Sequence, residues 1–303
     1  MIRNRLMLSP PADKTLIGVS RLQHALRVIG ATASVLDGSG PVSAVLIAPS
    51  DAGKSKLLLS AQPNNSRVLT DFTYGSLLNL LSKTEQPQPD FIVVPDLNIA
   101  VSHKPHVAQL TMALLLSVMG EGIVEIPGLD ERAKLKISKL KDRGVSVGLL
   151  TAMTPDIFRS RRGQWRKTGF LRRLVPLNYH YSAMTEKLIQ TSIRNGNSGL
   201  SYATSTFPIL PKSRVLIREK HAADLEVLSD NITRRQLAWS WTDRDGVKRT
   251  QQVTDYPFSA HKICRQLACA SALLRGSRQV TAEDLDVVND IAKFVRYDRA
   301  EEI

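Results

Sequence analysis

The chain has 303 residues, 43% of them hydrophobic, and carries a formal net charge of +13 at pH 7. This length allows one large domain, or a large domain with a small one, and the charge excess favours polyanionic partners. No apolar run reaches the roughly 18–20 residues of a membrane span, so we expect no membrane partner. Because no signal-peptide apolar core follows the basic N-terminal residues, the sequence predicts a cytoplasmic protein.

Hydrophobic periodicity predicts alternating helices and strands through the first 182 residues. Helices are expected at 14–34, 76–82 and 107–119, and residues 132–142 have helical composition. Strands are expected at 44–48, 67–70, 90–96 and 145–151, and residues 122–126 look like one arm of a hairpin. Strands that alternate with helices indicate a three-layer α/β core with a mostly parallel sheet.

The pattern becomes helical beyond residue 182, and no strong strand returns. Residues 260–294 predict a helix, a Gly-containing turn and a second helix, with Thr281 as the N-cap of the second. Cys264 and Cys269 share the first of these helical patterns, so we expect reduced core residues rather than a disulfide or a metal pair. Two domains follow from this division: an α/β core over 1–182 and a helical domain with an insert over 183–303.

The segment from Ala48 to Ser55 carries the most specific motif of the chain. An apolar run stops at Pro49, Gly53-Lys54-Ser55 follows, and an apolar helical pattern resumes at Leu57. A strand, a tight loop and a helix start in this order are typical of a phosphate-binding loop, although Ala48 stands where G-x-x-x-x-G-K-[ST] has its first Gly. A chance Gly-Lys-Ser is the alternative. We expect ATP to contact Pro49, Ser50, Asp51, Ala52, Gly53, Lys54, Ser55 and Lys56.

Asp96 ends the buried strand that follows the phosphate-binding loop. Parallel α/β sheets bind ligands beyond the carboxyl ends of their strands, which is where this carboxylate is expected. A nucleotide site needs such a group for Mg²⁺, so the sequence predicts a metal held by Asp96 and the Ser55 hydroxyl. The alternative is an aspartate that only caps the next helix.

In the order of its elements, the chain from about residue 14 to 295 resembles an AAA+ ATPase, and within that superfamily the branch of MoxR-type ATPases and MCM helicases. The resemblance implies a P-loop NTPase core followed by a C-terminal helical lid domain, with ATP and Mg²⁺ as cofactors. Residues 150–155 resemble the sensor-1 strand end, which makes Thr151 and Thr154 the candidates for a contact to the γ-phosphate. Residues 169–174 resemble the segment with the arginine finger, for which Arg173 is the best match and Arg172 the substitute.

Two positions depart from the pattern of this family. Leu97 stands where the family has its catalytic Glu directly after the Asp, and Asn98 could only orient water. The expected sensor-2 Arg falls close to Ser259, so Lys262 or Arg265 would have to substitute in contacting ATP. These departures indicate slow or partner-stimulated hydrolysis, with nucleotide binding retained.

Two basic clusters lie on either side of the predicted strand 145–151. The expected nucleic-acid contacts are Lys134, Lys136, Lys139, Arg161, Arg162, Arg166 and Lys167. Clustered Lys and Arg form the electrostatic footprint of nucleic-acid binding, although each cluster could equally be a solvated helix face. The sequence thus favours an ATPase that assembles into a homo-oligomeric ring or filament on ATP and acts on DNA. The alternatives are a MoxR-type chaperone with a protein client, or a nucleotide-binding regulator with negligible hydrolysis.

Overall fold

The structure is a computed structural model that describes residues 17–37, 39–83, 87–120, 131–195, 207–208, 210–236, 239–251, 258–296 and 300–303. Its centre is a six-stranded sheet in the order β2-β3-β4-β1-β5-β8, in which every neighbouring pair is parallel. The strands are β1 (Ser43–Ile47), β2 (Ser66–Val68), β3 (Phe91–Val94), β4 (Gly148–Met153), β5 (Leu174–His180) and β8 (Glu301–Glu302). The predicted α/β core with a mostly parallel sheet is confirmed.

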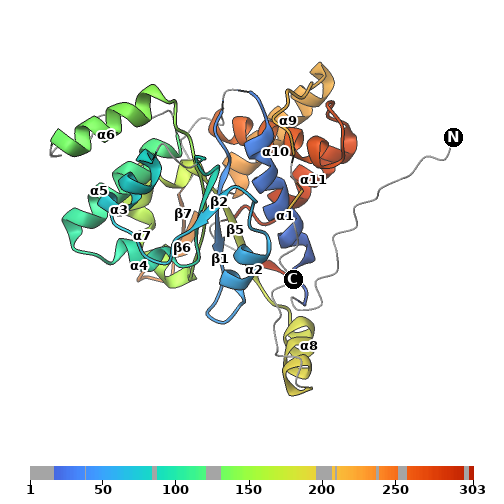
Figure 1. The fold of residues 1–303 in the computed structure, drawn as a ribbon. Coiled ribbons are helices and arrows are strands. Elements are labelled where there is room, and N and C mark those ends of the chain that lie inside the picture. Colours follow the sequence, from blue (N-terminus) through green and yellow to red (C-terminus); the bar gives the residue numbers. More distant parts are fainter. Residues whose placement is uncertain are drawn as a thin grey trace.

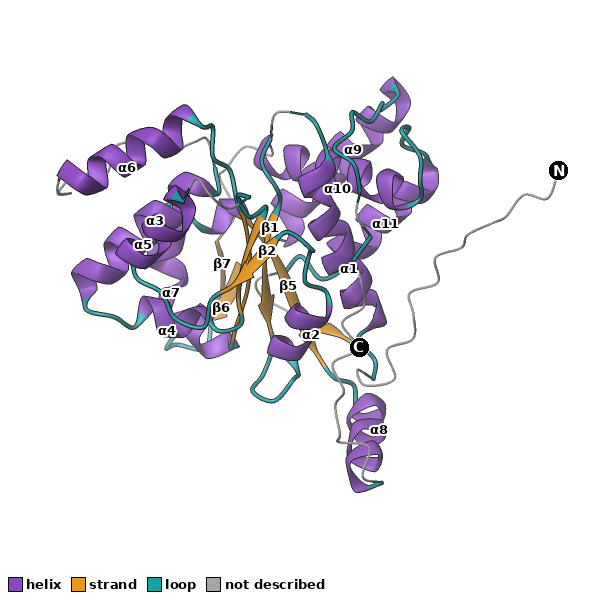
Figure 2. Cartoon of the chain, viewed as in Figure 1, coloured by secondary structure: helices purple, strands orange, loops and turns teal. Residues whose placement is uncertain are grey.

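Helices cover both faces of the sheet, as Figures 1 and 2 show. Within the core they are α1 (Ser20–Ala31), α2 (Lys54–Ser60), α3 (Tyr74–Ser82), α4 (Leu97–Val101), α5 (Pro105–Val118), α6 (Glu131–Asp142) and α7 (Pro155–Lys167). The short 3₁₀ turns η1 (Thr32–Ser34) and η2 (Leu171–Arg173) precede β1 and β5. Pro105 and Pro155 occupy the first helical turn of α5 and α7, where a missing N–H costs nothing.

Alternation along β1 divides the apolar residues between two cores. Ala44 and Leu46 face a core shared with α1 and the helices near the C-terminus, whereas Val45 and Ile47 face a core shared with α3, α5, α6 and α7. All five residues of β1 are buried, which is expected of a parallel strand covered on both faces. The strand that leads into the loop between β1 and α2 is therefore a buried inner strand, paired with β4 on one side and β5 on the other.

The region beyond residue 182 contains α8 (Ala183–Arg194), α9 (Glu219–Asn231), the π-helical turn η3 (Ile232–Gln236), α10 (Phe258–Leu274) and α11 (Ala282–Ala292). Thr281 caps α11 through a capping box with Asp284, as predicted. The turn before it passes through Gly276 at a φ of 76°, a left-handed conformation that suits glycine.

One expectation for this region is wrong, because strands do return. β6 (Trp239–Thr242) and β7 (Lys248–Gln251) form an antiparallel hairpin, and β8 adds to the main sheet. The hairpin turn at 243–246 has the sequence Asp-Arg-Asp-Gly, where the Asp243 carboxylate accepts hydrogen bonds from the amides of Asp245 and Val247. The flanking strands are too short and too polar to show a period of two.

The division at residue 183 stays a prediction, since α10 and α11 share one hydrophobic core with α1 and the sheet. The expected hairpin arm at 122–126 lies outside the described residues. Cys264 and Cys269 are buried and unpaired in α10, and burial raises the pKa of their thiols to about 12 and about 11. None of the helices that the structure describes is long and apolar enough to cross a membrane.

Candidate nucleotide-binding site

The loop between β1 and α2 reverses the chain at the carboxyl end of the central strand. Asp51 and Gly53 both have positive φ values, 61° and 71°. Asp tolerates this left-handed conformation better than most residues, and Gly adopts it without cost. Successive turns of this kind aim backbone N–H groups into a common concavity, which is the geometry of an anion site.

Lys54 begins α2 and folds back over this loop. Its Nζ donates hydrogen bonds to the carbonyl oxygens of Ala48, at 2.9 Å, and of Pro49. Burial lowers the pKa of Lys54 below its ordinary value, and the nearby carboxylates of Asp96 and Asp51 act in the opposite direction. The ammonium group is thus held inside the loop and within the electrostatic reach of Asp96.

Ser55 and Asp96 come together at the carboxyl ends of β1 and β3, which are separated in the sheet by β4. The Ser55 hydroxyl lies 3.5 Å from the carbonyl oxygen of Pro95, and the exposed Asp96 is the following residue. The Asp96 carboxylate accepts a hydrogen bond from the Asn98 amide at 2.9 Å. Asp96 therefore caps α4. Its role in binding Mg²⁺ stays a prediction.

The residues around Asp96 differ in what they can reach. Leu97 is fully buried in the core, so the position directly after the aspartate offers no polar group to the site. The Asn98 side chain is half-buried and its Oδ1 accepts a hydrogen bond from the Ser102 hydroxyl. Its role in orienting water stays a prediction.

The two threonines expected at the end of β4 occupy different environments. Thr151 is fully buried, and its hydroxyl donates to the carbonyl oxygen of Val94 at 2.8 Å, which ties β4 to β3. Thr154 is half-buried beyond the end of β4, directly after Met153, whose carbonyl oxygen accepts a bond from the Ala48 amide. Of the two, Thr154 is the residue that stands beside the loop.

Two tyrosines that we did not predict hold the loop from β5. The hydroxyls of Tyr179 and Tyr181 both donate to the carbonyl oxygen of Ala52, at 2.8 and 2.9 Å. Burial raises the pKa of both phenols above its ordinary value, so they stay protonated as donors. Tyr179 lies in β5, beside β1, and Tyr181 follows one residue beyond the end of β5. Their i, i+2 spacing becomes a signal only once the strand order is known.

We expect replacement of both Tyr179 and Tyr181 by Phe to weaken nucleotide binding while leaving the fold intact. The carbonyl of Ala52 would lose both partners, each worth about 0.5–1.5 kcal/mol, and the loop would have to order itself on binding. Affinity for ATP should therefore fall by roughly 5- to 100-fold, measured by titration with a fluorescent ATP analogue. The Tyr74→Phe variant, changed at the start of α3, serves as a control, and equal affinity in all three proteins would contradict the role.

Four predicted cationic residues lie at the opposite end of the sheet. Arg172 and Arg173 directly precede β5, whose first residue pairs with Ser43 at the start of β1. The five residues of β1 separate this end from the loop by roughly 16 Å. The Arg173 guanidinium donates to the Gly169 carbonyl oxygen at 3.1 Å, whereas Arg172 is exposed.

Lys262 and Arg265 are exposed on α10 at this same end. Between them and the sheet, Gln266 donates to the carbonyl oxygens of Ser39 and Gly40, just before β1 begins. This placement puts both residues out of reach of the loop between β1 and α2 in their own chain. Any contact to a nucleotide from Arg172, Arg173, Lys262 or Arg265 would have to be made to a second copy.

The basic residues of α6 and α7 are not equally available. Lys134 pairs with Glu131 at 2.8 Å, Lys136 donates to the Asn79 side chain, and Arg161 donates to the carbonyl oxygen of Val101 at 3.3 Å. Arg162 and Arg166 are half-buried, whereas Lys139 and Lys167 are exposed. Helix α6 leads into the amino end of β4, and helix α7 leads through η2 into the amino end of β5. The basic residues in the last turns of both helices therefore lie at the amino end of the sheet.

The residues of the site fit a nucleotide that carries its own metal ion. Among the described residues, no group of three or more His, Cys, Asp or Glu side chains forms a metal cluster. Mg²⁺ is commonly held by one or two carboxylates together with phosphate oxygens, rather than by an all-protein cage. The single carboxylate of Asp96 beside Ser55 and Lys54 matches that arrangement.

No family model and no curated protein matches the chain. Among solved structures, it is similar to a full-length MCM homologue from Methanopyrus kandleri, with a TM-score of 0.45 and 16% sequence identity. The match covers 92% of this chain and 55% of that chain, so this chain spans about half the length of that protein. A likeness at this level carries no argument about activity or partners, which have to be inferred from the site.

Proposed function

We propose that the chain is an ATPase of the AAA+ type that binds ATP with Mg²⁺ at the loop 48–55. The observation that carries the proposal is the convergence of Lys54, Ser55 and Asp96 at the carboxyl ends of β1 and β3. A loop with two left-handed residues supplies backbone donors at the same place. Phosphate groups are the ligands for which this combination of amides, an ammonium group and a carboxylate is suited.

Each residue has a defined task in this proposal. The loop amides bind phosphate oxygens, and Lys54 exchanges its bonds to the Ala48 and Pro49 carbonyls for bonds to the terminal phosphates. Ser55 and Asp96 would hold Mg²⁺, which when bound neutralises phosphate charge and favours attack by water. Thr154 would orient that water, and Arg172 or Arg173 of a second copy would offset the developing charge.

Hydrolysis is expected to be slow because Leu97 is buried and cannot activate water. General-base catalysis typically contributes about 10²–10⁴-fold, which is the part of the rate that this site lacks. The same observation favours a second candidate function, a nucleotide-binding regulator with negligible turnover. In both cases ATP would act as a switch that favours the state it binds better.

Steady-state phosphate release, with and without DNA, separates these two functions. For the ATPase we expect a low rate that depends on Mg²⁺ and falls at least about tenfold in Asp96→Ala. The control Asp71→Ala removes a carboxylate that follows β2, the edge strand beside β3, and that pairs with His103. This variant should keep the wild-type rate. ATP binding with no release under any condition would favour the regulator instead.

DNA is the proposed macromolecular partner, through the exposed basic residues at the amino end of the sheet. We expect the double variant Lys139→Glu/Lys167→Glu to bind duplex DNA more weakly and to show a shallower dependence of log K on log salt, by about one unit for each lysine that binds a phosphate. Fluorescence anisotropy over a range of salt concentrations measures both quantities. The matched control Lys187→Glu/Lys220→Glu changes two exposed lysines, on α8 and α9, and alters the net charge by the same amount.

A salt slope equal to that of wild type in Lys139→Glu/Lys167→Glu would contradict the placement of DNA at this surface. Absence of any DNA binding by the wild-type chain, together with ATP-dependent capture of one protein, would favour the alternative of a MoxR-type chaperone. No contact among the described residues selects a protein client over DNA, and only the charge favours the latter.

A further inference from the structure

An apolar cavity of about 440 Å³ lies beside the amino end of β5. Its walls come from the start of β5, the turns η2 and η3, and the helices α10 and α11. Protein interiors are close-packed and hold few voids larger than a water molecule, so a cavity of this size is unusual. Its volume lies within the range of pockets that bind small molecules. The cavity is separate from the candidate nucleotide site, which lies at the carboxyl ends of β1 and β3.

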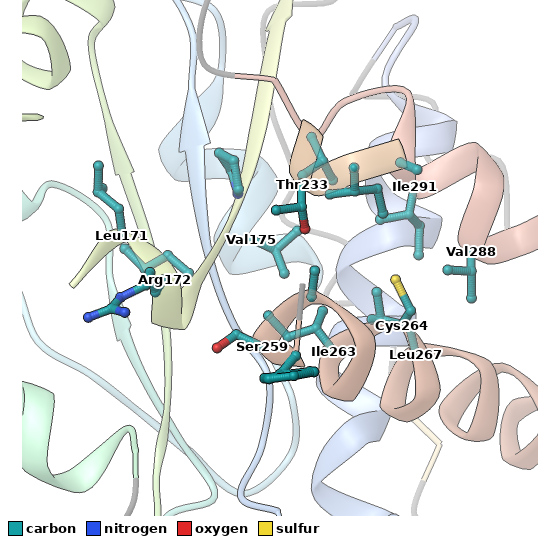
Figure 3. Close-up of a pocket in the computed structure, with 17 residues that line it drawn as sticks. Leu171, Arg172, Val175, Thr233, Ser259, Ile263, Cys264, Leu267, Val288 and Ile291 are labelled. Atoms are coloured by element: carbon teal, nitrogen blue, oxygen red, sulfur yellow. The ribbon is translucent and has the colours of Figure 1, made fainter. Parts of the chain in front are cut away.

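The deep part of the cavity is aliphatic and uncharged. Its side chains are at most 3% exposed and come from α10 and α11 (Figure 3): Cys264, Leu267, Val288 and Ile291. Burial raises the pKa of the Cys264 thiol to about 12, so this wall carries no thiolate. The hydroxyl of Thr233, which also lines the cavity, donates to the carbonyl oxygen of Ser229 at 2.9 Å. Apolar cavities of this kind stay dry and take up apolar molecules.

The other end of the cavity is polar and open to solvent. Arg172 and Ser259 line it there and are exposed, and Phe258 beside them is 68% exposed. In Figure 3 Arg172 and the Ser259 hydroxyl lie on the side away from Val288, and the guanidinium extends outward from the lining. Arg172 is the one charged residue among the described residues that line the cavity. Exposed Lys262 follows Ser259 by three positions on α10, which adds a second positive charge near the opening.

This change from an aliphatic interior to a cationic opening selects the chemistry of a ligand. A hydrocarbon chain gains affinity by leaving water for the deep part, by about fourfold for each buried methylene. A carboxylate at the opening would stay partly in water and accept charge-assisted hydrogen bonds from Arg172, whose planar guanidinium suits a carboxylate. A cationic head at the same place would be repelled by Arg172 and Lys262.

We propose that the cavity binds a free aliphatic carboxylate with a single chain, which lies between α10 and α11 while the carboxylate lies at Arg172. A volume at the lower end of the range of ligand pockets favours one chain over the two chains of a membrane phospholipid. The inference goes beyond the proposed function and does not depend on it, since the cavity and the loop 48–55 lie at opposite ends of the sheet.

Isothermal titration of the full chain with decanoate, and with two related probes, tests the charge and the chain separately. Decyltrimethylammonium has the same chain with a cationic head, and we expect it to bind at least about tenfold more weakly than decanoate. Hexanoate has the same head with four fewer methylenes, and its affinity should be lower by roughly 100-fold. Equal affinities for the two heads would show that Arg172 and Lys262 select no anion, which would overturn the proposal.

Two variants locate the bound decanoate. Ala260→Trp fills the cavity from its half-buried rim and should weaken binding at least about 100-fold, by excluding most of the chain. The control Ala223→Trp places the same side chain at an exposed position of α9 and should bind decanoate as wild type does. Thermal unfolding without ligand establishes that both variants are folded. Wild-type affinity for decanoate in folded Ala260→Trp would overturn the placement in this cavity.

Arg172→Gln separates a contact to the carboxylate from a structural role. We expect this variant to weaken binding of decanoate about tenfold, and to bind decyltrimethylammonium no more weakly than wild type does. A merely structural role would weaken binding of both probes alike, which would contradict the assignment of Arg172. Lys54→Ala should bind decanoate as wild type does, because Lys54 lies in the loop 48–55.

Sedimentation with phosphatidylglycerol vesicles distinguishes a free carboxylate from a membrane lipid. We expect the vesicles to carry down wild type and Ala260→Trp to the same extent, because the cavity has no part in that binding. Vesicle binding that is lost in Ala260→Trp, together with no binding of free decanoate by wild type, would assign the cavity to a lipid chain and overturn the proposal.

Discussion

Replacement of Lys54 by Ala is expected to abolish measurable ATP binding at micromolar protein concentration. The ammonium group would make charge-assisted hydrogen bonds to phosphate oxygens, worth about 1.5–3 kcal/mol each. Loss of one or two such bonds weakens binding by roughly 10- to 10⁴-fold. Isothermal titration of wild type and variant with ATP·Mg²⁺ measures the difference directly.

The control for Lys54→Ala has to separate the loss of one lysine charge from the loss of that charge at this position in the loop. Lys220→Ala removes an exposed lysine on α9 and should bind ATP as wild type does. Thermal unfolding of Lys54→Ala without nucleotide reports the separate loss of the bonds to Ala48 and Pro49. Unchanged affinity in a folded Lys54→Ala protein would refute the nucleotide site, whatever the loop resembles.

The order of β1, a tight loop and α2 was predictable from the sequence because its signal is local. Gly53, Lys54 and Ser55 are consecutive, and the apolar runs on both sides define the strand and the helix. The position of Asp96 followed from a general rule for parallel sheets, in which every strand presents its carboxyl end at the same edge. Neither prediction needed the strand order.

What the sequence could not provide depends on the order of the strands. β5 lies beside β1, and only this neighbourhood brings Tyr179 and Tyr181 to the carbonyl of Ala52. The choice between Thr151 and Thr154 likewise depends on where β4 ends, and the sequence placed that end two residues early. Thr151 therefore lies within β4, where its hydroxyl is bonded to β3, whereas Thr154 lies just beyond the end of the strand.

The cationic candidates lie at the end of the sheet opposite the loop between β1 and α2, which the sequence did not indicate. Along the chain, Arg172 and Lys262 are only substitutes for residues that the resemblance implies. In the fold both lie at the amino end of the sheet, where Arg172 also lines an apolar cavity. A single copy thus holds the proposed nucleotide site at one end of the sheet and the candidate cations at the other. The proposed contact from Arg172 or Arg173 to a nucleotide therefore requires a second copy.

Replacement of Asp284 by Ala is expected to destabilise the chain by about 2–4 kcal/mol. Asp284 is 1% exposed and accepts hydrogen bonds from the Ser271 hydroxyl, the Thr281 amide and the Arg275 guanidinium, the last at 2.7 Å. Its removal leaves buried donors without an acceptor and breaks the capping box of α11. Chemical denaturation followed by circular dichroism measures the loss.

The neighbouring Glu283→Ala provides the matched control for Asp284→Ala. Glu283 is 80% exposed and lies 3.8 Å from Arg275, so its loss should cost less than about 1 kcal/mol. The hydrogen bond that the Arg275 guanidinium donates to Asp284 raises the pKa of Arg275 above its ordinary value, which identifies Asp284 as the main partner of that guanidinium. Equal stability of the two variants would show that the network is not what joins α10 to α11.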